Sequence, residues 1–250
     1  LDFDLSVTLR DGAHHSGNWG GLLADPAMIL AQALSTITDA RGQLQIDAWK
    51  PTSLTPKIKT ALQDLPIHME NGPQIDPDWG EDTLTPAERA YGWNSFAVLA
   101  MKSGVPEAPQ NAISGSATAR GQLRFVVGTD PDQIISALRT HLDRRGFQAV
   151  EITPGDGYFP ATRLDPNDPW VARVAASITK TTGQAPHILP NLAGSLPNHC
   201  FSQVLGLPTI WVPHSYRGCS QHAPNEHVLK STCREALVLM AGIWGDLGQA

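Results

Sequence analysis

The sequence predicts an α/β protein in two parts: an α+β layer with helices on one face, then a second part of short strands and helices. Over the first 150 residues, the hydrophobic pattern gives the order strand, helix, insert, strand, helix, strand, which is typical of an α+β layer. A loop rich in Pro, Asp and Gly at 154–168 separates the two parts. The 250 residues, 41% hydrophobic and 17% charged, are enough for one large domain or two small ones.

Local signals mark the elements at the start of the chain. Alternating apolar residues predict a strand at 3–9, and the glycine-rich loop 14–21 follows. Pro26 then opens a helix whose apolar positions run to Ile37. The short apolar stretch 44–46 suggests another strand.

The stretch from about 47 to 105 is an insert in this layer. Helical pieces are predicted near 55–65 and over 85–100. Thr85 is the expected N-cap of the second piece, because Glu88 follows it three residues later as a capping box requires. After the insert, the layer closes with a strand, a helix and a strand at 121–127, 130–145 and 148–152.

The second part has weaker signals. A helix is predicted over 168–182, and a closing helix over 226–244. The apolar stretches 187–189 and 209–212 are expected to be short buried strands.

Charge and cysteine content exclude some functions and favour others. The net charge of −6 has no basic block behind it, which argues against a nucleic-acid partner and is compatible with a small-molecule substrate. No stretch approaches the roughly 18 apolar residues of a membrane span. Cys200, Cys219 and Cys233 lack CxxC spacing, so we expect no disulfide framework, no thiolate zinc cluster and a cytoplasmic location. Leu1 leads directly into the first strand, so we also expect a piece of a longer protein.

His222 is the residue most typical of a metal ligand. A neutral imidazole followed by Pro224-Asn225-Glu226, which we expect to open a helix, is suited to coordination. Zinc needs three or four ligands, and the other histidines show no HxH or HExxH spacing. The remaining ligands must then come from distant positions or from outside this chain; otherwise His222 is an ordinary surface or core histidine.

The glycine-rich loop holds a second candidate, His15, beside His14. Its glycines allow a ligand to approach the backbone closely while a histidine points toward it. The alternative is a turn with solvated histidines, and the loop alone does not decide between them.

Three further positions could bind a substrate. Arg124 offers a planar fork for a carboxylate, and Asn111 could donate to a developing oxyanion; a strand arginine can also simply cover a sheet face. Gly194-Ser195 at an expected helix entrance could cradle an anion, or Ser195 could be an N-cap. A serine nucleophile is not indicated, because the Gly-x-Ser-x-Gly elbow is absent.

Together these motifs resemble the M20 metallopeptidases, and in particular their carnosinase-like dipeptidase branch. His15-Ser16-Gly17 with Gly20-Gly21 resembles the start of the family's lid, or dimerisation, domain. Asn111-Ala112-Ile113, with Arg124 thirteen positions after Asn111, resembles its Asn-x-Ile-Pro segment and substrate arginine. Gly194-Ser195-Leu196-Pro197 and His222-Ala223-Pro224-Asn225-Glu226 resemble its glycine-rich loop and its last metal-ligand motif. The chain departs from the pattern at Ser114, where proline is usual, and at Ala193, where glycine is usual.

The resemblance implies a domain division and a missing partner segment. Residues 1–152 would be the lid with its antiparallel sheet, and residues 153–250 the C-terminal part of a three-layer α/β catalytic domain. In the family, a His-x-Asp pair, a bridging Asp and a Glu-Glu pair precede the lid and supply most zinc ligands and the general base. We therefore expect this chain to be the second half of such an enzyme.

The resemblance also implies a mechanism and roles. Two zinc ions would clamp a water that a glutamate deprotonates during amide hydrolysis. His15 would cross to the partner subunit of a homodimer formed through the lid and stabilise the oxyanion, with Asn111 assisting. Arg124 would hold the substrate carboxylate, Gly194 and Ser195 would bind the substrate, and His222 would be a terminal zinc ligand.

Three hypotheses follow. The first is a two-zinc dipeptidase or amidohydrolase acting on a dipeptide or an N-acyl amino acid, with this chain alone inactive and without tightly bound zinc. The second is a non-catalytic dimerisation module. The third is an unrelated binding protein with scattered histidines.

Overall fold

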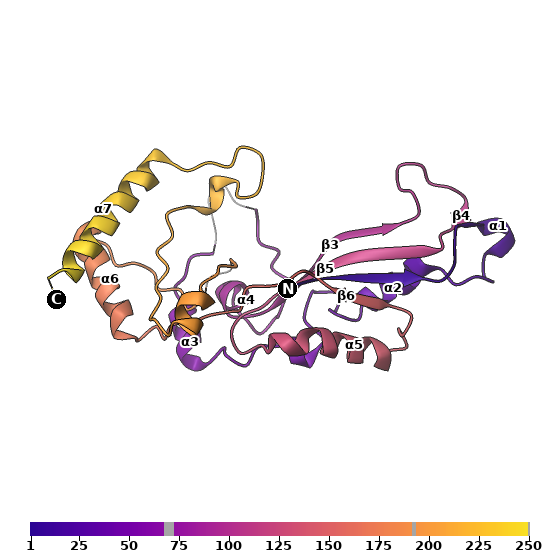
Figure 1. Cartoon of the computed structure of the whole chain (residues 1–250), viewed down its shortest axis with the longest axis horizontal. Coiled ribbons are helices and arrows are strands. Elements are labelled where there is room, and N and C mark those ends of the chain that lie inside the picture. The colour runs from indigo at the N-terminus through magenta and orange to yellow at the C-terminus, as the bar shows by residue number, and fades with distance from the viewer. Residues whose placement is uncertain (68–72, 192–193, 250) are drawn as a thin grey trace.

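The chain folds into two lobes, seen side by side in the computed structural model, which describes residues 1–67, 73–191 and 194–249 (Figure 1). We call residues 1–154 the N-terminal lobe and residues 155–249 the C-terminal lobe. The sheet of the N-terminal lobe lies at the right of Figure 1 and the C-terminal lobe at the left, with the N-terminus near the middle.

A four-stranded antiparallel sheet forms the N-terminal lobe, in the order β3-β5-β1-β6. Alternation in β1 determines which face is buried: Phe3, Leu5 and Val7 are fully buried, while Asp4 and Ser6 between them face the other side. The strands are β1 (Asp2–Thr8), β3 (Ser95–Ser103), β5 (Ser116–Arg124) and β6 (Glu151–Pro154).

Two helices cover the buried face of this sheet. α2 (Pro26–Leu34) packs on β1 and β5, and α5 (Ile134–Arg144) packs beside β6. Trp49 lies fully buried in the same core, where its indole Nε1 donates to the Ile134 carbonyl at 3.0 Å. The predicted antiparallel sheet with helices on one face is therefore confirmed.

A repeated local signal starts the helices. An Asp or Thr side chain accepts a hydrogen bond from a backbone N–H two or three residues later, and a proline occupies the first helical position. The capping box expected for Thr85 and Glu88 is present. The helices that begin in this way are α2, α3 (Pro56–Leu62), α4 (Pro86–Tyr91), the short 3-10 helix η2 (Pro131–Gln133) that leads into α5, and α6 (Pro169–Thr182).

Two predictions near the insert were wrong. The helix expected over 85–100 ends at Tyr91, and Ser95–Ser103 is strand β3. Pairing with β5 along the length of this apolar run decides its structure. The strand expected at 44–46 is reduced to one isolated bridge between Thr38 and Leu44. The insert helices α3 and α4 share a small core of their own, made of Ile58, Leu62, Ala87 and Tyr91.

The C-terminal lobe contains α6 and the long helix α7 (Lys230–Leu247). Asp246 of α7 accepts from Ser177 Oγ at 2.7 Å and from Lys180 Nζ at 2.6 Å, which joins the two helices. The strands expected at 187–189 and 209–212 do not form, and the closing helix begins at Lys230 rather than Glu226. Within the described part of the chain, no helix has the length and apolar character needed to cross a membrane.

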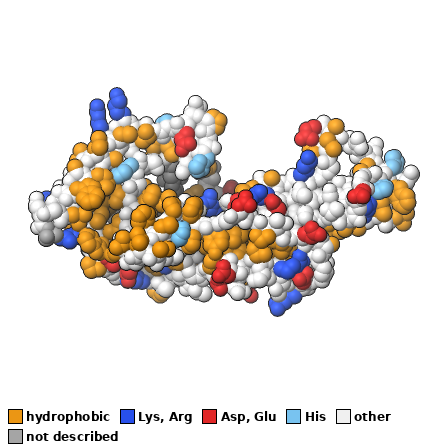
Figure 2. All heavy atoms as spheres, viewed as in Figure 1, with side chains coloured by type: hydrophobic (Ala, Val, Ile, Leu, Met, Phe, Trp, Pro, Cys, Tyr) orange, Lys and Arg blue, Asp and Glu red, His pale blue; other side chains and the backbone are white. Residues whose placement is uncertain are grey.

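Many large hydrophobic side chains of the C-terminal lobe are exposed, and they gather at the left of Figure 2. In the described residues of this lobe, the buried hydrophobic side chains other than proline are Cys219, Leu239 and Ile243. Val204 and Leu237, by contrast, are 75% and 74% exposed. Contiguous exposed apolar surface of this kind marks an interaction face.

Candidate functional site

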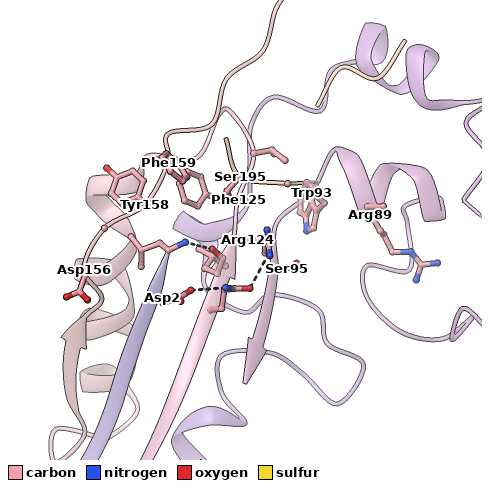
Figure 3. A pocket seen from close by; sticks show the side chains of 17 residues that line it. Asp2, Arg89, Trp93, Ser95, Arg124, Phe125, Asp156, Tyr158, Phe159 and Ser195 are labelled. Atoms are coloured by element: carbon pink, nitrogen blue, oxygen red, sulfur yellow. Dashed lines mark hydrogen bonds between the residues drawn. The ribbon is translucent and has the colours of Figure 1, made fainter. Parts of the chain in front are cut away.

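A cavity of about 580 Å³ lies where the sheet meets the C-terminal lobe. Arg124 at the end of β5 lines it together with Gly194 and Ser195 of the C-terminal lobe. Figure 3 shows Ser195 above the Arg124 side chain. The fold thus brings together three of the residues that the sequence singled out.

A chain of side-chain hydrogen bonds orients Arg124. Asp2 Oδ1 accepts from Gln122 Nε2 at 2.9 Å, and Gln122 Oε1 accepts from Arg124 Nε at 3.2 Å (Figure 3). Arg89 is a second cation of the lining, and its guanidinium donates to the Trp79 carbonyl. Because Gln122 engages the Nε atom, the guanidinium plane of Arg124 is fixed by β5 itself and not by a mobile loop.

The loop that carries Gly194 and Ser195 differs from the expected helix entrance. The nearest helix is the single π-helical turn η3 (Cys200–Val204), so Ser195 is not its N-cap. Ala193, the departure from the family pattern, lies outside the described residues. Asparagines on both sides anchor the loop: Asn191 donates to the Tyr91 carbonyl at 2.5 Å, and Asn198 donates to Thr162 Oγ1 at 2.8 Å.

Arg163 connects this loop to the insert. Its Nε donates to Asn191 Oδ1 at 3.1 Å, while Nη1 and Nη2 donate to the carbonyl and hydroxyl oxygens of Ser53 at 3.0 and 3.1 Å. Burial lowers the pKa of the Arg163 guanidinium, although an arginine stays charged at any physiological pH. Arg163 therefore connects the loop that carries Gly194 and Ser195 to the segment before α3.

His15 and Asn111 lie together at the far tip of the N-terminal lobe, at the right of Figure 1. Strand β2 (His14–His15) pairs with β4 (Ala112–Ile113), and α1 (Ser16–Trp19) follows directly. The Asn111 carbonyl accepts from the backbone N–H of Ser16 at 2.9 Å and from its hydroxyl at 3.1 Å. The cavity is lined by Asp2, Ser95 and Arg124 at the other end of the sheet, so one protomer does not bring His15 and Arg124 together.

The tautomer of His15 follows from its own turn. Nδ1 accepts from the Gly17 backbone N–H at 3.1 Å, so a neutral ring carries its proton on Nε2. The His15 side chain is exposed. It can therefore offer an Nε2–H donor to a group outside this protomer. A Cβ at position 17 would lie 2.7 Å from His15 Cε1, so glycine at this position keeps space for the ring.

His222 lies on a strained loop and not at a helix start as expected. The non-glycine residues with positive φ in the described chain are Ser220, His222 and Asn225, all in this loop. Such conformations cost about 1–3 kcal/mol each and concentrate at functional sites. His227 closes the loop: its ring Nδ1 lies 2.8 Å from the Asn225 carbonyl and its Nε2 lies 2.5 Å from the Tyr216 hydroxyl.

The residues present do not make a complete zinc site. Across the described ranges, no group of three or more His, Cys, Asp or Glu side chains comes together in a way that could hold a metal ion. His222 is exposed, and its backbone N–H donates to Glu226 Oε2 at 3.4 Å. We therefore assign no step of a reaction to a metal held by this chain alone.

The sequence interpretation missed four aromatic residues that line the cavity: Trp93, Phe125, Tyr158 and Phe159. Tyr158 and Phe159 lie in the linking loop, where no periodic pattern draws attention to them. The pKa of Tyr158 is raised by burial, and by the nearby carboxylates of Asp132 and Asp130. Two adjacent aromatic residues in a stretch rich in Pro, Asp and Gly were the available signal.

The comparison with known proteins agrees with this fold. The sequence profile of the M20 peptidase dimerisation domain matches residues 4–150. No curated protein sequence matches the chain. A metallo-carboxypeptidase of the M20 family from Sulfolobus solfataricus has a similar structure, with a TM-score of 0.79 and 21% sequence identity over 97% of this chain and 56% of that one.

Two further solved structures are similar. A dipeptidase from Saccharomyces cerevisiae has a TM-score of 0.76 and 19% identity, and the match covers 100% of this chain and 54% of that one. Human carnosine dipeptidase 1 has a TM-score of 0.73 and 16% identity over 100% of this chain and 55% of that one. The chain thus spans about half the length of these structures. The hypothesis of an unrelated binding protein is wrong, because the family profile matches more than half of the residues: the chain belongs to the M20 peptidase family.

Proposed function

We propose that the chain is part of a two-zinc M20 hydrolase that cleaves an amide bond in a small substrate with a carboxylate, either a dipeptide or an N-acyl amino acid. The cavity that joins Arg124 to Gly194 and Ser195 carries this proposal. In it, Arg124 pairs with the substrate carboxylate through its planar fork. Ser195 and the adjacent backbone, including Gly194, bind the substrate on the opposite wall.

The position of His15 supports a role in a second subunit. Its exposed ring lies at the tip of the N-terminal lobe, away from the cavity, and Asn111 lies next to it. In this proposal, the Nε2–H of His15 donates to the oxyanion that develops in the partner's site, and Asn111 assists. The role requires a homodimer with a two-fold axis through the N-terminal lobe.

The edge strand β3 is where we place that dimer contact. Val98, Leu99 and Met101 on this strand are 45%, 51% and 47% exposed, and an exposed apolar edge strand favours pairing with another chain. We expect Leu99→Lys to convert a dimer to a monomer in sedimentation analysis. Leu207→Lys removes a similarly exposed apolar side chain, 52% exposed, in the other lobe and is the control. A dimer that survives Leu99→Lys contradicts this placement.

The C-terminal lobe supports a catalytic domain completed by another polypeptide segment. Its exposed apolar side chains form a face that a further layer would cover. We propose that this segment supplies the general base and the remaining zinc ligands, and that His222 is a terminal ligand to one ion. Residues 1–152 would then be the lid, and residues 153–250 part of the catalytic domain.

Zinc titration of the chain tests this division of ligands. We expect no stoichiometric zinc binding with a dissociation constant below about 1 µM and no amide hydrolysis, because one histidine does not hold zinc tightly. His222→Ala is the matched control, and it should leave any weak zinc binding almost unchanged. Tight one-to-one binding that His222→Ala abolishes contradicts the assignment of the missing ligands to another segment.

Arg124 is tested by binding of N-acetyl-L-alanine, followed by NMR titration. We expect Arg124→Gln to weaken binding about tenfold or more, since a charge-assisted hydrogen bond contributes about 1.5–3 kcal/mol. Arg120→Gln changes an exposed arginine of the same strand that pairs with Asp4 at 3.6 Å instead, and it should have no effect. Equal effects of the two substitutions contradict the role of Arg124.

A non-catalytic dimerisation module is the second candidate function. The observation that favours it is that the matched profile covers the dimerisation domain, residues 4–150. A stable dimer together with no carboxylate binding in the cavity would support this second function. For either function we propose a cytoplasmic location, which the three free cysteines Cys200, Cys219 and Cys233 support.

A further inference from the structure

The cavity beside Arg124 has an aromatic wall that the carboxylate role does not use. Tyr158, Phe159 and Phe125 gather on one side of Arg124 in Figure 3, and Trp93 lies on the other side. These rings come from three separate segments of the chain. The fold therefore surrounds one guanidinium with aromatic surface on two sides.

Contacts with one another and with a residue outside the cavity hold these rings in place. Tyr158 packs edge-on against Phe125, with ring centroids 5.8 Å apart and an interplanar angle of 68°. The Trp93 indole donates to Glu81 Oε1 at 3.1 Å. Aromatic rings supported in this way keep their orientation when a ligand arrives, so less conformational entropy is lost on binding.

Part of the aromatic surface is open to a ligand. Tyr158 and Phe159 are 39% and 48% exposed, and Phe125 and Trp93 are half-buried. The cavity volume of about 580 Å³ falls within the range of sites for small organic ligands. Asp156 also lines the cavity, but Figure 3 places it at the outer edge, away from Ser195.

We propose that this cavity selects a ligand that carries an aromatic or large apolar side chain next to its carboxylate, with Tyr158, Phe159 and Trp93 as specificity-determining residues. The carboxylate pairs with Arg124 and the side chain lies against the aromatic wall. This inference rests on the proposed function, because it takes Arg124 as the carboxylate site. It narrows the substrate class to amides of amino acids such as phenylalanine, tyrosine or leucine.

The carboxylate and the side chain of a ligand are recognised by different groups of the cavity. The pairing of Arg124 with a carboxylate is the same for every N-acyl amino acid, whereas contact with the wall depends on the side chain. A ring that fills the space between Phe159 and Trp93 gains apolar burial and edge or face contacts. The methyl side chain of N-acetyl-L-alanine gains almost no apolar burial and no ring contacts.

The test measures binding of three ligands to the whole chain by NMR titration: N-acetyl-L-phenylalanine, N-acetyl-L-alanine and N-acetyl-L-phenylalaninamide. We expect the phenylalanine ligand to bind about tenfold more tightly than the alanine ligand, as one aromatic contact predicts. The amide lacks the carboxylate and should bind more weakly than the phenylalanine ligand. Phe159→Ala should reduce the preference for phenylalanine to less than about threefold and leave alanine binding unchanged.

Phe201→Ala is the control, because Phe201 is 51% exposed in the same lobe and does not line the cavity. It should keep the tenfold preference. Equal binding of the phenylalanine and alanine ligands overturns the aromatic wall but leaves the role of Arg124 standing. Equal binding of the phenylalanine ligand and its amide overturns the carboxylate site, and with it the proposed function. A preference that survives Phe159→Ala and a second variant, Tyr158→Ala, also overturns the inference.

Discussion

Replacing Arg163 by methionine should loosen the loop that carries Gly194 and Ser195. Methionine keeps an unbranched apolar chain but removes three hydrogen bonds, one to Asn191 and two to Ser53. Asn191 is only 7% exposed, so its Oδ1 would lose a partner in a buried position.

The expected loss of free energy follows from these hydrogen bonds. Each contributes about 1 kcal/mol net, and one buried acceptor left unsatisfied costs about 1–3 kcal/mol. Burial of the guanidinium, which lowers the pKa of Arg163, offsets part of this because the charged group is partly removed from water. We expect a net loss of about 2–3 kcal/mol in the free energy that holds the loop closed.

Hydrogen–deuterium exchange measures this free energy locally. Amides near Asn191 and Asn198 should exchange about 30–150 times faster in Arg163→Met, as a loss of 2–3 kcal/mol implies. Arg173→Met is the control, because Arg173 is on α6 and its guanidinium lies 5.5 Å from the Trp170 ring centroid, an exposed contact that contributes little. Equal exchange in Arg163→Met and the native chain would refute the idea that Arg163 anchors the loop.

Three further substitutions test the N-terminal lobe. Gly115→Ala should destabilise it by at least about 1–3 kcal/mol in urea unfolding, because a Cβ would lie 2.2 Å from the Arg10 carbonyl oxygen; unchanged stability would contradict this packing. Gly17→Ala should barely change stability, because the added Cβ meets only the flexible His15 ring. It should displace this ring from its hydrogen bond with the residue 17 N–H and so change the ring ¹⁵N shifts in NMR; unchanged shifts would contradict the hydrogen bond on which the tautomer assignment rests. Burial lowers the pKa of His141, so the unfolded chain binds a proton at this residue more readily, and the free energy of unfolding should fall as pH drops below about 6.5. His141→Gln should therefore flatten the plot of thermal midpoint against pH between pH 7 and pH 5. An equally steep plot for this variant would argue against the contribution of His141.

Local chemistry made most helix starts predictable from the sequence. An Asp or Thr followed by Pro satisfies a free backbone N–H and sets the first φ angle without help from distant residues. The helices that open at Pro26, Pro86 and Pro169 therefore begin where the sequence placed them. Boundaries that depend on distant partners were less accurate, as Glu226 shows: α7 starts only at Lys230.

Strands and the cavity were harder to predict because they depend on contacts between separate segments of the chain. The apolar run in β3 fits a helix or a strand equally well, and only pairing with β5 decides. The apolar stretches 187–189 and 209–212 form no strand with any described segment. Arg124 and Ser195 were singled out by residue type and given roles by the family resemblance. Trp93 and Tyr158 belong to no motif and became visible only when the fold brought them to the same cavity.

The strand order of the N-terminal lobe has a consequence for synthesis on the ribosome. β1 pairs with β5 and with β6, so its neighbours on both sides are made more than one hundred residues later. Until about residue 124 has left the exit tunnel, the apolar residues Phe3, Leu5 and Val7 have no sheet to join. The nascent chain must therefore carry an unpaired apolar strand while the more than one hundred residues between β1 and the end of β5 are made, which makes it a candidate client for chaperones that bind such segments.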